Sequence, residues 1–97
     1  RHRNVPISSS GSFDRSPCGT ATCARMATLV AKGELEVGET FVNEGLLGTI
    51  YRGIPLRETA REGHQAIVAE VEGSAWISAC GTLLVDPTDP LGTGYLA

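Results

Sequence analysis

Cys18, Gly19 and Thr20 form the group of residues in this chain best suited to chemistry. Pro17 precedes the cysteine and an apolar run follows it, so we expect Cys18 in the first turn of a helix, with Ser16 as N-cap and Pro17 at the first helical position. The first turn of a helix carries unpaired N–H groups and a partial positive charge. Such a turn binds a carboxylate or phosphate and favours the thiolate form of a cysteine.

This stretch therefore predicts a carboxylate site with a reactive sulfur at its rim. The N–H groups of Gly19 and Thr20 would hold the anion, and Asp14, just upstream, could accept hydrogen bonds from a substrate ammonium group. Two plainer interpretations remain open. A cysteine in apolar surroundings is usually a small buried hydrophobic residue, and an aspartate in such a loop is commonly a turn or cap residue.

The other cysteines and the histidines give weaker signals. Cys23, inside the helix, and Cys80, in a strand-like segment, are expected to be structural, and His64 beside a glycine is expected in an exposed loop. Three cysteines are too few for a disulfide framework, and their spacing does not favour a metal site. Reduced thiols predict a reducing, cytoplasmic compartment.

One helix and several strands must position these residues. We expect the helix over about residues 18–32, and because its surface is apolar apart from a narrow polar strip, other elements should surround it. Strands are predicted within residues 41–59, over 65–71 and over 74–85, the last two joined as a hairpin at Glu72–Gly73. The expected fold class is α+β, a central buried helix wrapped by mostly antiparallel strands.

Composition argues against several classes of partner. The 97 residues carry a formal net charge of −3 and are 41% hydrophobic and 20% charged, an ordinary globular composition. Lysine and arginine are scattered, so we expect no nucleic acid and no acidic membrane as a partner, and no apolar run is long enough to span a bilayer. The chain opens with RHRNVPISSS rather than with methionine, so we expect a processed or trimmed piece of something longer.

The stretch DRSPCGTATCARMA, residues 14–27, closely resembles the second active-site motif of the proline racemase family, which includes 4-hydroxyproline epimerases and trans-3-hydroxyproline dehydratases. The resemblance continues through AKGELEVGETFVNEGLLGTIYRG and AIVAEVEGSAWISACGTLLVDPTDPLGTGYL, so it covers nearly the whole chain. It implies a fold similar to that of diaminopimelate epimerase, with two similar lobes and the site in the cleft between them. Residues 1–97 resemble the C-terminal part of such a chain: part of one lobe, comprising most of the tail of the second lobe, without the first lobe.

The resemblance implies a racemase or epimerase that inverts the Cα of proline or hydroxyproline without a cofactor or a metal. One cysteine thiolate removes the Cα proton and a second thiol reprotonates the opposite face. Carried over to this sequence, Cys18 is one acid/base, the N–H groups of Gly19 and Thr20 hold the carboxylate, and Asp14 contacts the ring nitrogen. The implied partners are the small imino acid and the rest of the same chain, and a homodimer is also allowed.

The Met-Cys-Gly-His motif of the family's first lobe does not occur in these residues. Cys23 lies on the same helix as Cys18, and Cys80 has no helix start beside it, so neither is expected to face Cys18 across a substrate. The isolated chain is therefore expected to be inactive. Three rivals remain: a non-catalytic carboxylate-binding or structural remnant, a hydroxyproline dehydratase, against which Cys18 argues without excluding it, and a thiol hydrolase pairing Cys18 with His64.

Overall fold

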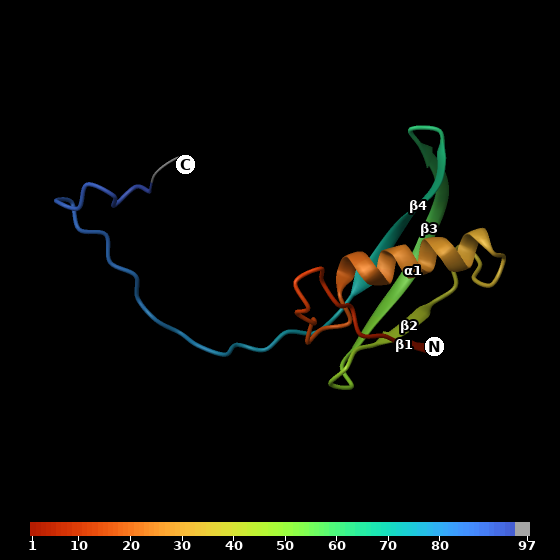
Figure 1. Ribbon diagram of the computed structural model, residues 1–97, viewed down its shortest axis with the longest axis horizontal. Coiled ribbons are helices and arrows are strands. Elements are labelled where there is room, and N and C mark those ends of the chain that lie inside the picture. The colour runs from red at the N-terminus through yellow and green to blue at the C-terminus, as the bar shows by residue number, and fades with distance from the viewer. Residues whose placement is uncertain (95–97) are drawn as a thin grey trace.

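One helix lies across a curved four-stranded sheet in the computed structural model, which describes residues 1–94 (Figure 1). The strands are β1 (His2–Arg3), β2 (Phe41–Glu44), β3 (Ile50–Arg61) and β4 (His64–Glu72), and they lie in the order β1-β2-β3-β4. β1 runs parallel to β2, whereas β2 with β3 and β3 with β4 are antiparallel. This arrangement confirms the α+β class and the mostly antiparallel sheet.

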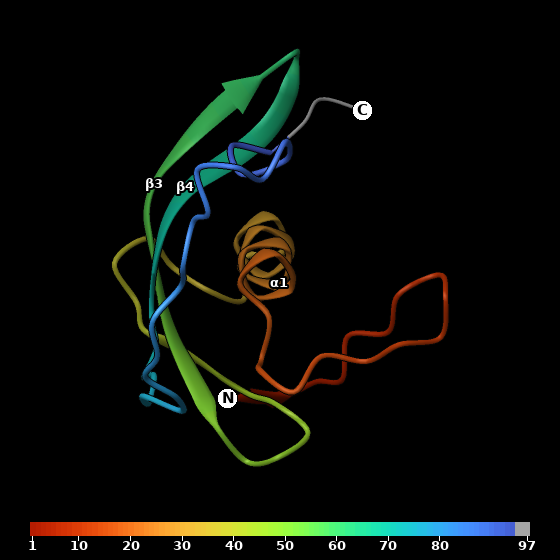
Figure 2. The same cartoon turned by 90° about the vertical axis from the view of Figure 1, so that its left-hand side faces the viewer.

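The helix, α1, spans Gly19–Ala31 and lies within the curve of the sheet (Figure 2). Its buried residues recur at helical spacing and so form one stripe against the strands: Thr22, Met26, Leu29 and Val30. The strands curve around one side of the helix, as expected of part of a lobe.

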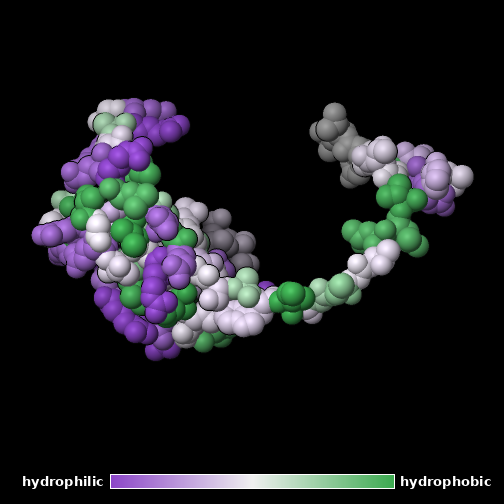
Figure 3. Space-filling view, turned by 180° about the vertical axis from the view of Figure 1, so that it is seen from behind, coloured by the Kyte–Doolittle hydropathy of each residue, from purple (hydrophilic) through white to green (hydrophobic). Residues whose placement is uncertain are grey.

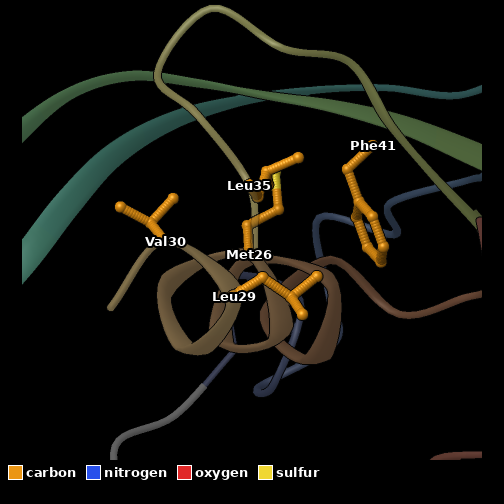
Figure 4. Packing of buried hydrophobic residues seen from close by; sticks show 5 residues of the cluster. All are labelled: Met26, Leu29, Val30, Leu35 and Phe41. Atoms are coloured by element: carbon orange, nitrogen blue, oxygen red, sulfur yellow. The ribbon is translucent and has the colours of Figure 1, made fainter. Parts of the chain in front are cut away.

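A small core joins α1 to the sheet. Met26, Leu29, Val30, Leu35 and Phe41 are buried together, and Met26 rises from the helix toward Leu35 (Figure 4). β3 crosses the helix so closely at Gly53 that an added Cβ would lie 2.5 Å from both Cε and Sδ of Met26. Glycine at this position therefore sets how near the sheet approaches the helix.

β3 and β4 form one long hairpin whose turn is at Glu62–Gly63. Both turn residues have positive φ, 50° and 79°, as a type I′ turn requires. The chain does not reverse at Glu72–Gly73, where a hairpin was predicted, because the residues after β4 leave the sheet instead of folding back along it. The pairing also shifts register between Pro55 and Arg57, since proline has no N–H to donate to the ladder.

After β4 the chain leaves the sheet as an extended segment, residues 73–94, that crosses open space (Figures 1 and 3). The strand predicted over 74–85 is absent from the structure, because no neighbouring strand among residues 1–94 pairs with it. Its large apolar side chains are exposed: Trp76, Ile77, Leu83, Leu84 and Val85. The radius of gyration is 18.8 Å, against about 13 Å for a compact domain of 100 residues.

The predicted turns over residues 86–94 are present, with backbone hydrogen bonds from Asp89 to Asp86 and from Gly92 to Asp89. Residues 95–97, which include the end of the family-like stretch, lie outside the described part of the chain. Within the described part, no helix has the length and apolar character needed to cross a membrane.

Candidate active site

Cys18 is the N-cap of α1. Its carbonyl oxygen accepts a hydrogen bond from the N–H of Thr22 at 3.0 Å, and its Sγ accepts one from the N–H of Ala21 at 3.5 Å. The sequence predicted Ser16 as the cap and Pro17 inside the helix, and this detail is wrong. Pro17 is fully buried before the helix begins, and the N-cap lies two residues later than predicted, at Cys18.

The backbone of Cys18 is strained. Its φ is 67° and its ψ is 122°, a region that residues with a Cβ rarely adopt. Such a conformation costs on the order of 1–3 kcal/mol and persists only where the surroundings hold it, most often at functional sites. The thiol therefore stands at a point where the fold imposes a particular backbone direction.

Asp14 closes the loop that leads to the thiol. Its Oδ1 accepts hydrogen bonds from the N–H and the hydroxyl of Ser16, each at 3.0 Å, and Ser16 Oγ accepts one from the N–H of Cys18 at 3.1 Å. The backbone N–H of Ser16, then its hydroxyl, hold the pKa of Asp14 below the ordinary 3.8, and a hydrogen bond from the Cys18 side chain adds to this. The carboxylate thus lies beside the thiol while it closes a turn, the plainer of the two roles expected for it.

The N–H groups of Gly19 and Thr20 remain free at the helix start. Both residues are exposed, and neither N–H has a hydrogen-bond acceptor within residues 1–94. Asp14, Cys18, Gly19 and Thr20, the four residues expected to act together, therefore lie within one turn of loop and the first turn of α1. Two free N–H donors, a half-buried thiol and a carboxylate are the polar groups available there.

A cavity of about 670 Å³ lies beside this turn without including the thiol. Asp14, Arg15, Tyr51 and Trp76 are among the residues that line it, whereas Cys18, Gly19 and Thr20 are not. Within the described residues, the helix start is therefore an open surface, with room for a facing part of a larger site.

Sequence reasoning missed two residues behind the thiol. Thr22 and Asn43 are fully buried polar side chains that hydrogen-bond to each other at 3.0 Å, and both contact the backbone next to Cys18. A signal was available, because both are polar residues at inward positions, one on an apolar helix face and one in an alternating strand. Ser16, predicted only as a cap, instead links Asp14 to the Cys18 N–H.

The remaining candidates lie apart from this turn. Cys23 is half-buried against the core, as expected, whereas Cys80 is exposed in the extended segment rather than placed in a strand. His64 is an exposed residue at the start of β4 and has no hydrogen bond to Cys18 in the described structure. Among residues 1–94, no three His, Cys, Asp or Glu side chains gather as metal ligands would.

Comparison with known proteins matches this chain almost end to end. The sequence model described as "Proline racemase" matches residues 1–96. A proline racemase of Clostridioides difficile is 46% identical over 98% of this chain, and a trans-3-hydroxy-L-proline dehydratase of Bacillus cereus is 46% identical over 97%. The chain spans only 28% of the length of either relative.

Two solved structures share the fold. A hydroxyproline epimerase from Agrobacterium vitis, with bound trans-4-OH-L-proline, matches 98% of this chain with a TM-score of 0.75 and 29% identity. A probable proline racemase from Agrobacterium radiobacter, with bound carbonate, matches 98% with a TM-score of 0.77 and 32% identity. This chain again spans only 27–28% of theirs. With a family match over nearly all of its residues, the chain belongs to the proline racemase family.

Proposed function

We propose that this chain is the part of a cofactor-independent amino-acid racemase or epimerase that carries one of two proton-transfer thiols. The observation that supports it most is the turn at Cys18, where the thiol, two free N–H groups and the Asp14 carboxylate come together. The substrate would be proline or a hydroxyproline, since the family includes enzymes named for both.

Each group at the turn would have one task. The N–H groups of Gly19 and Thr20 would bind the substrate carboxylate, which stabilises the negative charge that develops when the Cα–H bond breaks. Asp14 would accept a hydrogen bond from the ring nitrogen. The Cys18 thiolate would take the Cα proton and become a thiol, and a second thiol on the opposite face would donate its proton to the Cα carbanion.

The second thiol would come from the rest of a longer chain. Neither Cys23 nor Cys80 would serve as this second thiol. Cys23 packs against the core behind the helix start, and Cys80 lies in the extended segment. Residues 1–97 alone would then provide one face of the site and would not invert Cα.

The test is exchange of the Cα proton of L-proline and trans-4-hydroxy-L-proline in D₂O, catalysed by the full-length protein. We expect solvent deuterium at Cα and the appearance of the opposite epimer. Formation of the epimer should be lost in Cys18→Ser, because a hydroxyl is a far weaker base and proton donor than the thiolate and thiol it replaces. Cys23→Ser is the matched control and should form the epimer at the wild-type rate. Epimer formation that survives Cys18→Ser at the wild-type rate would contradict the two-thiol mechanism.

A dehydratase is the second candidate, because the Bacillus cereus relative of that activity is as similar as the racemase of Clostridioides difficile. The same Cα deprotonation followed by loss of a 3-hydroxyl group as water would give a dehydrated product. Incubation with trans-3-hydroxy-L-proline separates the two, since a dehydratase consumes it and a racemase or 4-epimerase leaves it unreacted.

A further inference from the structure

Thr22 and Asn43 hold the backbone on both sides of Cys18. Thr22 is in the first turn of α1 and Asn43 is in β2, and both side chains are fully buried. We propose that this pair positions the Cys18 thiol and the Gly19 N–H for proton transfer. The inference rests on the proposed function and adds two positioning residues to it.

The peptide group between Pro17 and Cys18 is fixed at both edges. Its carbonyl oxygen accepts a hydrogen bond from Asn43 Nδ2 at 3.3 Å, and Thr22 Oγ1 lies 3.4 Å away as the weaker branch of a hydroxyl that donates mainly to the Cys18 carbonyl. Its N–H, on the opposite edge, donates to Ser16 Oγ at 3.1 Å. Because a peptide group is planar and trans, these bonds set the orientation of the whole plane.

The next peptide group, between Cys18 and Gly19, is held from behind. The carbonyl oxygen of Cys18 accepts hydrogen bonds from Thr22 Oγ1 at 2.6 Å and from Thr22 N at 3.0 Å. The N–H of Gly19 belongs to the same plane and points the opposite way, out of the helix start. Since φ and ψ of Cys18 are the rotations between these two planes, fixing both planes fixes the direction of its Cα–Cβ bond.

Asn43 is itself held in one orientation. Its Oδ1 accepts a hydrogen bond from Asn4 Nδ2, and its Nδ2 donates to Thr22 Oγ1 at 3.0 Å. Within residues 1–94, no buried side-chain nitrogen or oxygen lacks a partner. A fully satisfied buried network of this kind specifies one arrangement rather than several.

Steric contact supports the same placement two residues further along. A Cβ added at Gly45 would lie 3.0 Å from Pro17 N and 3.1 Å from the carbonyl carbon of Ser16. These are backbone atoms, which cannot yield as a flexible side chain can. The end of β2 therefore contacts the loop directly, and the polar bonds from Asn43 act at short range.

The chain offers a matched control for Thr22. Thr28, on the same helix, makes the same kind of bond, from its Oγ1 to the carbonyl of Ala24 at 3.0 Å, but it is exposed and does not touch the loop. In the full-length protein, we expect Thr22→Val to lower kcat for Cα–H exchange by about 10- to 100-fold, the scale of loss when a reacting group moves by about 1 Å. Thr28→Val and Thr22→Ser, which keeps the hydroxyl, should stay near wild type.

Two further measurements separate positioning from general damage. The urea midpoint of each variant shows whether it is folded in the assay, and the rate at which iodoacetamide alkylates Cys18 reports the thiol without needing activity. We expect Thr22→Val to change that rate and Thr28→Val to leave it unchanged. Equal effects of the two valine variants, or a loss that only follows the unfolded fraction, would overturn the inference.

A milder variant keeps the inference testable if Thr22→Val does not fold. Asn4→Ala removes one hydrogen bond to the Asn43 amide and leaves α1 untouched, so its kcat for Cα–H exchange should fall. The kcat of Thr28→Val should stay at the wild-type value. A wild-type kcat in Asn4→Ala would count against the network. If the wild-type protein exchanges no Cα proton, the proposed function fails, and the alkylation rates alone decide whether Thr22 positions the thiol.

Discussion

Asp14 holds the loop before Cys18 and is also the proposed contact for the ring nitrogen of a substrate. Its Oδ1 accepts hydrogen bonds from the N–H and the hydroxyl of Ser16. The Ser16 Oγ in turn accepts a hydrogen bond from the N–H of Cys18. The carboxylate is thereby kept at a set place next to the thiol. A substrate contact at the ring nitrogen would use a group whose position the loop already determines.

The contribution of Asp14 to the free energy of unfolding should depend on pH in a definite direction. Hydrogen bonds from Ser16 lower the pKa of Asp14 from 3.8 in the folded protein, so the unfolded chain takes up the proton first as pH falls. The stabilisation is complete above the unfolded pKa and is lost as pH drops through the lower, folded pKa. We expect a carboxyl-carbon NMR titration of the full-length protein to place the Asp14 midpoint below 3.8.

Removing the Ser16 hydroxyl should shift only this titration. In Ser16→Ala the Asp14 midpoint should move up toward 3.8, because one of its hydrogen-bond donors is gone. Asp86 is the internal reference, since the N–H and hydroxyl of Thr88 lower its pKa in the same way. An Asp14 midpoint that stays in place while Ser16 is changed would mean that the hydroxyl does not hold the carboxylate.

Among the elements, the helix was predictable and its exact beginning was not. Residues 18–32 were expected and Gly19–Ala31 is observed, because apolar spacing and Gly33 are local signals. Serine before proline is the usual cap pattern, but the burial of Pro17 against β2 depends on residues 26 or more positions away. Long-range contact of that kind leaves no mark in the local sequence.

The hairpin error has a similar cause. Glu-Gly occurs at both 62–63 and 72–73, and the second pair is flanked by the more apolar segments, which favoured it. The residues next to the true turn are polar because β3 is exposed over residues 56–61, so they lack the alternation that indicates a strand. The burial of Asn43 was not predicted, because a polar residue in a strand is ordinarily expected to face solvent.

The contact between β3 and α1 can be tested by a double-mutant cycle. Gly53→Ala would place a methyl group against Met26 Cε and Sδ, and such overpacking costs about 1–3 kcal/mol. Met26→Ala alone leaves a cavity in the core and costs about 2–5 kcal/mol. We expect the double variant to be clearly less destabilised in urea than the sum of the two, because the new methyl group enters the space that the methionine leaves. Strict additivity would show that the two residues do not touch.

At the scale of the whole molecule, the extended segment is the feature that the described fold leaves unexplained. Ile77 and Leu83 are 93% and 98% exposed, and burying each would contribute about 1.5–3 kcal/mol. The matches to solved relatives cover 98% of this chain but only 27–28% of theirs. We expect the remainder of a longer chain to supply a strand and an apolar surface for residues 74–85, so the strand predicted there stays a prediction for the intact protein.

Hydrogen exchange of the full-length protein tests this directly. Backbone amides of residues 76–85 should exchange slowly, because pairing in a sheet would protect them. Those of Ser9 and Ser10, in an exposed loop and without a hydrogen-bond acceptor among the described residues, should exchange fast and serve as the internal reference. Equally fast exchange in the two groups would rule out a paired strand.

The register shift at Pro55 divides the pairing of the long hairpin into two segments. Residues 52–55 pair with 69–72 against the helix, whereas 57–61 pair with 64–68 beyond the shift. A bulge bends its strand and interrupts the ladder. Ile67 lies beyond the shift and still packs against the core, so the bend carries the hairpin around α1 instead of releasing its outer part from the helix.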